Sequence, residues 1–90
     1  MEYKAIKTSP RDNVAILAQP TPKGKTVTVP DSGEAVVVNQ DIAFGHKVAL
    51  VPIAKGADIF RYGEVICVAA GDIKPGDWVH VHNTTSKEGG

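Results

Sequence analysis

The segment His80-Val81-His82-Asn83 holds the densest group of potentially reactive side chains in the sequence. If the strand that begins at Trp78 continues through it, the two histidines project from the same face. Imidazole is a good ligand for divalent transition metals and a common acid or base in catalysis. The residues alone leave two interpretations open: part of a metal or acid–base site, or a solvated, hydrogen-bonded strand face.

Three more polar side chains are candidates for binding a ligand. His46 and Lys47 follow a glycine, which lets the backbone or a ligand approach closely, and a lysine can bind a carboxylate or phosphate. Strand periodicity places Lys47 on the face opposite Val48, which equally fits an exposed lysine without a ligand. Tyr62 lies in a turn between two apolar runs, as a positioned hydroxyl or as an aromatic lid over the core.

The elements that must position these residues are short strands. The chain has twelve Val and seven Ile but two Leu, and β-branched side chains favour strands over helices. A short helical turn is expected over Val14–Ala18, capped by Asp12 or Asn13, because their side-chain oxygens accept helix N–H bonds. The sequence therefore predicts a mostly β domain with one helical turn, and strands at 3–6, 26–29, 34–38, 46–51, 58–61, 64–68 and 78–82.

A weak internal recurrence links these strands. A corner containing lysine and glycine precedes a strand three times, at Pro22-Lys23-Gly24, Ala54-Lys55-Gly56 and Lys74-Pro75-Gly76. In the third corner, Pro75 and Gly76 are the central residues that a type II turn prefers. Such closely spaced corners predict a compact, folded-back set of strands, too close together for a solenoid.

Composition excludes several classes of protein. The 90 residues carry ten basic and ten acidic side chains, so no net positive charge favours nucleic acid or an anionic membrane. No apolar run reaches the roughly 20 residues of a membrane span. A single cysteine, Cys67, cannot form an internal disulfide, which favours a reducing, cytoplasmic location; its apolar neighbours predict an inert, buried side chain. The polar segment 84–90 is expected to be a flexible tail.

Three motifs in order give the chain a family resemblance. They are Ile42 to Leu50 (IAFGHKVAL), Arg61 to Ile66 (RYGEVI) and Trp78 to Asn83 (WVHVHN), preceded by Asp12-Asn13-Val14-Ala15. Together they resemble the SAF domain of the altronate and galactarate dehydratase family over residues 3–83. Two positions depart from the usual pattern, because Arg61 replaces a lysine and Cys67 replaces a glycine. Both departures leave the substrate open.

The resemblance implies a β-clip fold over residues 1–83 and a much larger catalytic partner. In this family the SAF domain is either fused to that catalytic part or forms a separate subunit, as in altronate dehydratase small subunits and sulfolactate sulfo-lyase alpha subunits. A chain running from Met1 to just beyond the motifs resembles the separate subunit. An N-terminal fragment of a fused enzyme has the same appearance.

The resemblance also implies the chemistry of the site. Dehydration of a sugar acid removes the proton beside the carboxylate and expels the neighbouring hydroxyl, helped by a divalent metal, for which iron or manganese is expected. His80 and His82 are then predicted to be catalytic and metal-binding. The substrate-binding residues are expected to be His46, Lys47, Arg61, Tyr62 and Asn83. The isolated chain is expected to be inactive, and a stand-alone SAF-type binding or assembly module is the alternative from another class.

Overall fold

The structure, a computed structural model, describes residues 2–87. Within this range every regular element is a strand, and none of the described residues forms a helix able to cross a membrane. This confirms the predicted mostly β fold class. The strands are β1 (Tyr3–Ile6), β2 (Val14–Leu17), β3 (Thr26–Thr28), β4 (Ala35–Val37), β5 (Lys47–Ala49), β6 (Asp58–Arg61), β7 (Glu64–Ala69), β8 (Trp78–Val79) and β9 (Thr84–Thr85).

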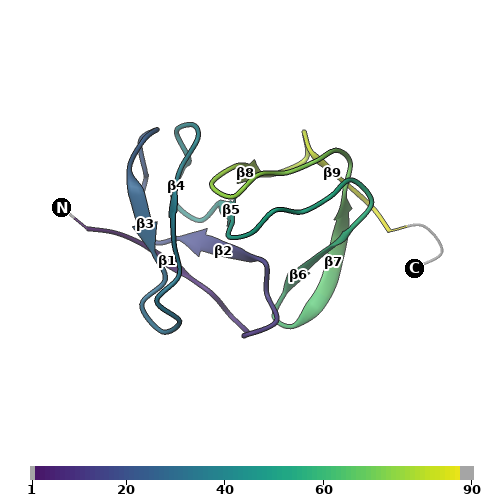
Figure 1. The fold of residues 1–90 in the computed structure, drawn as a ribbon, viewed down its shortest axis with the longest axis horizontal. Coiled ribbons are helices and arrows are strands. Elements are labelled where there is room, and N and C mark those ends of the chain that lie inside the picture. The colour runs from purple at the N-terminus through teal and green to yellow at the C-terminus, as the bar shows by residue number, and fades with distance from the viewer. Residues whose placement is uncertain (1, 88–90) are drawn as a thin grey trace.

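The strands form two curled sheets (Figure 1). The larger sheet has the order β4-β3-β1-β2-β5-β8, and the smaller has the order β6-β7-β9. All pairs are antiparallel except β1 with β3. Strands β2, β5 and β8 lie in the middle of the molecule, between β1, β3 and β4 on one side and the β6–β7 hairpin on the other (Figure 1).

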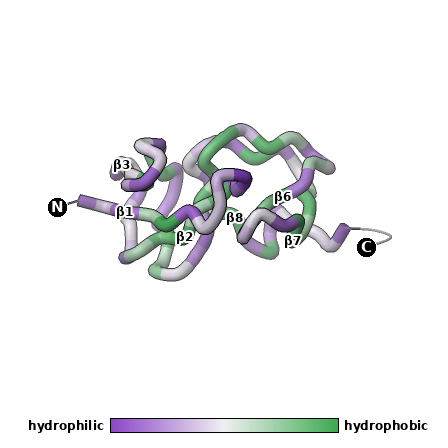
Figure 2. The backbone as a smooth tube through the Cα atoms, turned by 90° about the horizontal axis from the view of Figure 1, so that it is seen from below, coloured by the Kyte–Doolittle hydropathy of each residue, from purple (hydrophilic) through white to green (hydrophobic). Residues whose placement is uncertain are grey.

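Two hydrophobic cores hold the sheets together, and β2 and β5 contribute to both. Ala15 and Val48 face the first core, whereas Val14 and Ala49 face the second. Because both faces of these strands are covered, their residues are apolar in succession and do not alternate with polar ones. Along the backbone as a whole, short apolar segments alternate with polar ones (Figure 2).

The predicted helical turn at Val14–Ala18 is wrong, because Val14–Leu17 is strand β2. Four successive apolar residues fit a buried strand as well as a helix, and periodicity alone does not separate them. The segment is a strand because it pairs with both β1 and β5. The side-chain oxygen of Asn13 does cap a backbone N–H, but that N–H belongs to Phe60 in β6, at 2.9 Å.

The three predicted corners are confirmed, and the structure adds a fourth. Each is a four-residue turn closed by a hydrogen bond from its last N–H to its first carbonyl, at residues 22–25, 43–46, 54–57 and 74–77. The third residue is always a glycine with φ between 81° and 89°, and its N–H donates to a carbonyl in a strand or, for Gly24, to that of Val38 directly after β4. The fourth corner, residues 43–46, ends at His46.

Gly76→Ala is expected to destabilise the domain strongly. A Cβ on Gly76 would lie 2.0 Å from the Val37 carbonyl oxygen, so the backbone of β4 must move. The matched control is Gly24→Ala, since Gly24 has the similar φ of 86° but nothing within 4 Å of its Cβ position. The control should lose about 1 kcal/mol of unfolding free energy and Gly76→Ala clearly more, as measured by urea denaturation. Equal losses would contradict the steric argument.

The segment expected to be a polar tail begins with a strand. Thr84 and Thr85 form β9, which pairs with Ala69 and Val68 at the end of β7. Lys87 forms an ion pair with Asp58, with its Nζ 3.2 Å from the carboxylate. The remaining part of the predicted tail, residues 88–90, lies outside the described residues.

Candidate functional site

The segment His80–Asn83 forms a turn, so the predicted strand over 78–82 is too long. Strand β8 ends at Val79, and the Asn83 N–H donates to the His80 carbonyl at 3.1 Å. The Asn83 side chain stabilises the turn, because its Oδ1 accepts the His80 N–H at 3.0 Å and its Nδ2 donates to the Trp78 carbonyl at 2.9 Å. His80 and His82 therefore do not project from one strand face.

The three histidines nevertheless gather around Trp78, and these four residues are called the imidazole cluster below. The His80 ring stacks on the indole, with centroids 5.0 Å apart and planes 11° apart. The His82 ring lies 4.9 Å from the indole, and the His46 ring lies 5.6 Å from it. The centroids of His46 and His80 are 5.1 Å apart. The fourth corner and the 80–83 turn thus place His46, His80, His82 and Asn83 around Trp78.

Hydrogen bonding distinguishes His46 from the other two histidines. Its Nδ1 accepts a hydrogen bond from Trp78 Nε1 at 3.1 Å. The ring nitrogens of His80 and His82 are absent from the hydrogen bonds within residues 2–87. His80 is half-buried and His82 is exposed. Two of the three imidazoles therefore keep both ring nitrogens available to a ligand or another protein surface.

Lys47 lies outside the imidazole cluster. It precedes Val48, which faces the first core with Trp78, so its side chain leaves the opposite face of β5. There its charge acts on Cys67. Burial raises the pKa of the Cys67 thiol, while the charge of Lys47 and a hydrogen bond with Thr84 lower it less. Cys67 is half-buried beside the second core, so its side chain is accommodated where the family pattern has a glycine.

Arg61 and Tyr62 lie at the tip of the β6–β7 hairpin, away from the imidazole cluster. The tip is anchored by Asp12, whose carboxylate accepts the N–H groups of Tyr62 and Gly63 at 3.1 and 2.8 Å. Ile16 pairs in the sheet with Lys47, the residue after His46. Asp12 lies four residues before Ile16, which corresponds to roughly 13 Å of extended chain. The structure therefore does not bring Arg61 and Tyr62 together with the histidines.

The hairpin tip has its own cationic and aromatic character. The Arg61 guanidinium lies 4.9 Å from the centroid of the Tyr62 ring, and Arg11 lies 4.7 Å from the ring of Phe60. Tyr62 is 64% exposed and adopts a φ of 58°, which is unusual for a residue other than glycine. The Asp12 hydrogen bonds hold this conformation, so Asp12 has a structural role at the tip.

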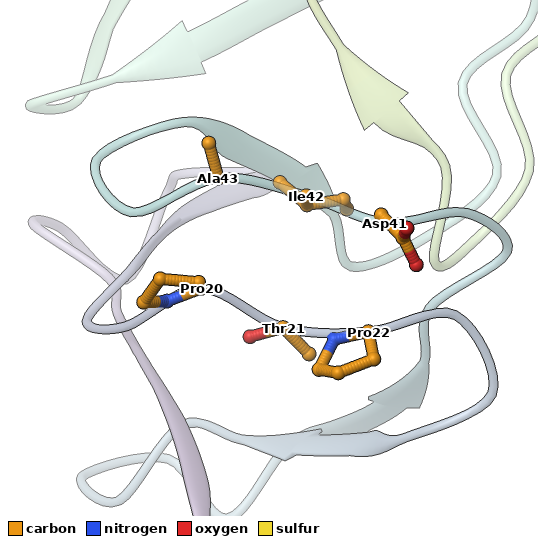
Figure 3. Close-up of a pocket in the computed structure, with 6 residues that line it drawn as sticks. All are labelled: Pro20, Thr21, Pro22, Asp41, Ile42 and Ala43. Atoms are coloured by element: carbon orange, nitrogen blue, oxygen red, sulfur yellow. The ribbon is translucent and has the colours of Figure 1, made fainter.

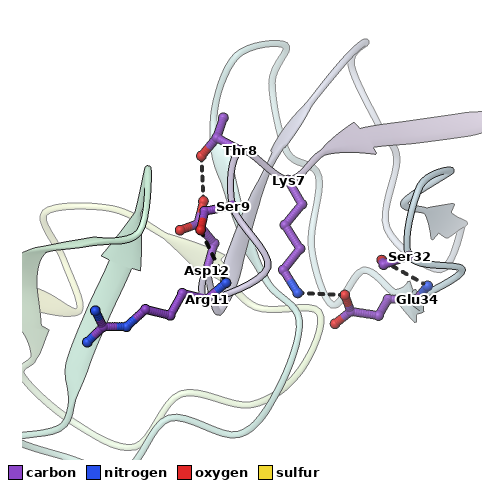
Figure 4. A network of polar contacts seen from close by, with 7 residues as sticks. All are labelled: Lys7, Thr8, Ser9, Arg11, Asp12, Ser32 and Glu34. Carbon is purple, nitrogen blue, oxygen red and sulfur yellow. Dashed lines mark hydrogen bonds and ion pairs between the residues drawn. The ribbon is translucent and has the colours of Figure 1, made fainter.

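Asp12 and Glu34 are carboxylates with polar contacts to neighbouring side chains (Figure 4), and their pKa values are lowered. Burial by itself would raise the pKa of Asp12, but hydrogen bonds from the Thr8 hydroxyl and the hairpin N–H groups outweigh it and lower that pKa. Hydrogen bonds from Lys7 and Ser32 lower the pKa of Glu34, and the Lys7 Nζ lies 2.8 Å from its carboxylate. Both groups therefore favour the folded state when ionised.

The domain should lose stability in acid because of these two carboxylates. Their pKa values are lower when folded than when unfolded, so their contribution is complete above about pH 4 and is lost as the pH falls below it. Urea unfolding between pH 6 and pH 2 should show this decline, and it should be shallower in Asp12→Asn and Glu34→Gln. An identical pH dependence in both variants and the parent would contradict the assignment.

The described residues do not by themselves fit the divalent metal that the resemblance implies. Within residues 2–87 no group of three or more His, Cys, Asp or Glu side chains is placed to hold a metal ion. No carboxylate joins the imidazole cluster, and Nδ1 of His46 is already bonded to Trp78. His80 and His82 would supply at most two ligands, so any metal would need ligands from beyond the described residues.

An apolar hollow between residues 20–22 and 41–43 lacks groups that would bind an acid. It has a volume of about 390 Å³ (Figure 3), and it is lined by Pro20, Thr21, Pro22, Asp41, Ile42 and Ala43. Its only charged side chain is Asp41, whose Oδ1 accepts the Lys23 N–H at 2.8 Å. A carboxylate ligand would be repelled there, so this hollow is a poor candidate for binding an acid.

Sequence reasoning missed the central role of Trp78 and the exposure of Phe44. Trp78 was grouped with the strand, although it is the residue that all three imidazoles contact. Phe44 occupies the lysine position of the fourth corner and is 67% exposed. The signal for that corner was present, because Ile42-Ala43-Phe44-Gly45 repeats the pattern of Ile53-Ala54-Lys55-Gly56.

Comparison with known proteins identifies the family of the chain. Residues 3–87 match the family model described as the altronate/galactarate dehydratase SAF domain. The chain is 44% identical over 84 residues to an altronate dehydratase of Escherichia coli and 38% identical over 79 residues to one of Bacillus subtilis. These matches cover 93% and 88% of this chain but 16% of each relative.

A relative of a different size also matches. The chain is 38% identical over 61 residues to the alpha subunit of (2R)-sulfolactate sulfo-lyase from Paracoccus pantotrophus. That match covers 68% of this chain and 91% of the relative. The family model spans nearly all described residues, and the relatives are named as dehydratases and as a sulfo-lyase subunit. The chain therefore belongs to the altronate/galactarate dehydratase SAF domain family.

Proposed function

We propose that this chain is the small subunit, or the N-terminal domain, of a sugar-acid dehydratase resembling altronate dehydratase. In this role it contributes substrate-binding and proton-transferring side chains to a hydro-lyase that a larger catalytic part completes. The observation that carries the proposal is the gathering of His46, His80 and His82 on Trp78 in a chain of this family.

The incompleteness of the cluster supports a larger catalytic partner. Its imidazoles are half-buried or exposed, and within residues 2–87 they are not part of a group of three or more His, Cys, Asp or Glu side chains that could hold a metal. The chain spans about one sixth of the length of the altronate dehydratases that it resembles. The remaining catalytic groups and the walls of the active site are therefore assigned to the larger part.

Exposed apolar side chains beside the cluster give that partner a surface to cover. Phe44 is two residues from His46, and Val81 stands between His80 and His82, with exposed fractions of 67% and 79%. Large apolar side chains with this exposure are typical of surfaces that another polypeptide covers. Covering them would exclude water from the imidazoles, which strengthens their electrostatic interactions with a substrate.

The proposed reaction needs groups that this chain offers. A base removes the proton from the carbon beside the carboxylate, and the electron pair forms a double bond as the neighbouring C–O bond breaks. The departing hydroxide needs a proton to leave as water, and the resulting enol rearranges to the 2-oxo acid. His80 or His82 would transfer one of these protons, because their ring nitrogens are available. His46 and Asn83 would bind the substrate or hold the turn.

The predicted substrate-binding residues outside the imidazole cluster, and the divalent metal, remain part of the proposal. Lys47, Arg61 and Tyr62 reach the substrate only if the larger part extends its site around the domain, since they lie on other faces. The divalent metal, iron or manganese, likewise requires that most ligands come from the larger part. When bound, such a metal would stabilise the charge that develops on the substrate carboxylate.

A second candidate function is the alpha subunit of a sulfolactate sulfo-lyase. The size of the relative favours it, because the match covers 91% of that subunit. The same proton would be removed, but the neighbouring C–S bond would break and sulfite would leave. The substrate would then be a sulfonated hydroxy acid.

Affinity purification of the tagged chain from its native cells tests the proposal. A much larger polypeptide should accompany it in stoichiometric amount, and the complex should dehydrate an aldonate or release sulfite from sulfolactate. The purified 90-residue chain alone should turn over neither substrate. A chain that emerges alone would contradict the separate-subunit form of the proposal, and a chain that is active alone would contradict both forms.

Removing the exposed apolar side chains should weaken the complex without unfolding the domain. Phe44→Ser with Val81→Ser should raise the dissociation constant for the larger part at least tenfold, because interface aromatic side chains contribute strongly to binding. Ile66→Ser is the control, since Ile66 is 45% exposed but lies on β7, away from the cluster. Equal effects of control and double variant, measured by calorimetry, would place the interface elsewhere.

A further inference from the structure

The hydrogen bond between Trp78 and His46 has a direct chemical consequence. An indole Nε1–H can only donate, so Nδ1 of His46 must present a lone pair at 3.1 Å. An imidazole with its lone pair on Nδ1 carries its hydrogen on Nε2. The bond thus selects one of the two neutral forms of His46, the form in which Nε2 is a donor.

Trp78 is held firmly enough to impose this choice. Its carbonyl accepts a hydrogen bond from Asn83 Nδ2 at 2.9 Å, and its residue pairs with Val48 in the sheet. The indole also packs against the first hydrophobic core. The backbone and the indole of Trp78 are therefore both held in place, and this fixes the direction of the Nε1–H bond.

The Nε2 atom of His46 has no partner within the described chain and is open to solvent. Among residues 2–87, the side-chain nitrogen that is buried without a hydrogen-bond partner is Nε of Arg61. The half-buried His46 uses Nδ1 in the hydrogen bond to Trp78, and no bond of its Nε2 is recorded among these residues. A donor that is fixed in direction and unpaired is suited to an oxygen acceptor of a ligand.

We infer that Trp78 is a positioning residue that fixes His46 as a hydrogen-bond donor, and that its Nε2–H binds an oxygen of the substrate carboxylate or hydroxyl. The identity of the ligand rests on the proposed function, whereas the state of the His46 ring does not. The same argument separates the three histidines: His46 donates a hydrogen bond, and the proton-transfer role falls to His80 or His82.

Nitrogen NMR of the ¹⁵N-histidine-labelled 90-residue chain tests the first half without substrate or partner. His46 should show a protonated Nε2 and an unprotonated Nδ1, whereas exposed His82 should show an average of both forms. In Trp78→Phe, which keeps an aromatic ring but removes the donor, the His46 signals should move toward that average. A protonated Nδ1 in the parent, or unchanged signals in Trp78→Phe, would overturn the inference.

Kinetics of the complex with its larger part test the second half. Glutamine can accept from Trp78 through its carbonyl and still donate through its amide, so His46→Gln should keep KM for altronate within a few-fold. His46→Ala should raise KM at least tenfold, because an oxygen of the substrate loses its donor. Equal KM values in the two variants would overturn the substrate assignment. If no lyase complex exists, this half fails with the proposed function, while the NMR result still decides the role of Trp78.

Discussion

Val48→Asp should leave the domain unfolded at room temperature. Val48 is completely buried in the first core, and its strand β5 lies between β2 and β8. The buried residues of the first core around it are hydrophobic, and the cost of burying a charge without a partner is several kcal/mol. A 90-residue domain has only roughly 5–13 kcal/mol of stability. Loss of amide dispersion in the proton NMR spectrum would show the unfolding.

Two control variants separate charge burial from other effects at β5. Val48→Ala removes packing without adding charge, so it should lower the unfolding free energy by about 2 kcal/mol and leave the domain folded. Val51→Asp places the same charge on a side chain that is 41% exposed, and it should be tolerated. If Val48→Asp kept the thermal midpoint of the Val51→Asp control, the first core would not be the element that holds the sheet together.

The fold could be predicted from the sequence where local chemistry determines it. The corner at Lys74-Pro75-Gly76 was predictable, because proline and glycine each fit one position of a type II turn. Strand β2 was not predictable as a strand, since its four apolar residues gain their strand character from distant partners: Ile16 pairs with Ile6, 10 residues away, and Ala15 pairs with Val48, 33 residues away. Tertiary pairing of this kind leaves no periodic pattern in the segment itself.

The candidate site could be predicted only in part, for a similar reason. The residues His46, His80 and His82 were found because imidazoles are rare and chemically distinctive. Their arrangement was not found, since it depends on the turn that Asn83 stabilises and on the indole of Trp78. Motif order grouped Arg61 and Tyr62 with the histidines. Asp12, however, holds these two residues before the start of β7, and the turn at residues 80–83 lies near the end of that strand.

In the complete lyase, His80→Ala and His82→Ala should have the largest effects on turnover. Loss of an acid or base that acts in the reaction typically lowers the rate roughly 10²–10⁴-fold. The fold should survive, because both rings lie on the surface turn and their nitrogens make no hydrogen bonds within the described part of the chain. Activity is measured on the complex with the larger part, and thermal midpoints of the variant domains report on folding.

The two substitutions also distinguish the two histidines. His80 stacks flat on Trp78 and approaches His46, so its loss removes both a proton donor and a neighbour of the substrate donor. His82 is exposed and tilted against the indole, so its loss should lower kcat and leave the binding of the larger part unchanged. Lys55→Ala is the control. Lys55 is an exposed residue of the corner at residues 54–57, and its variant should keep full activity. If both histidine variants retained the turnover of this control, the proton-transfer role would belong to the larger part, and this domain would serve substrate binding alone.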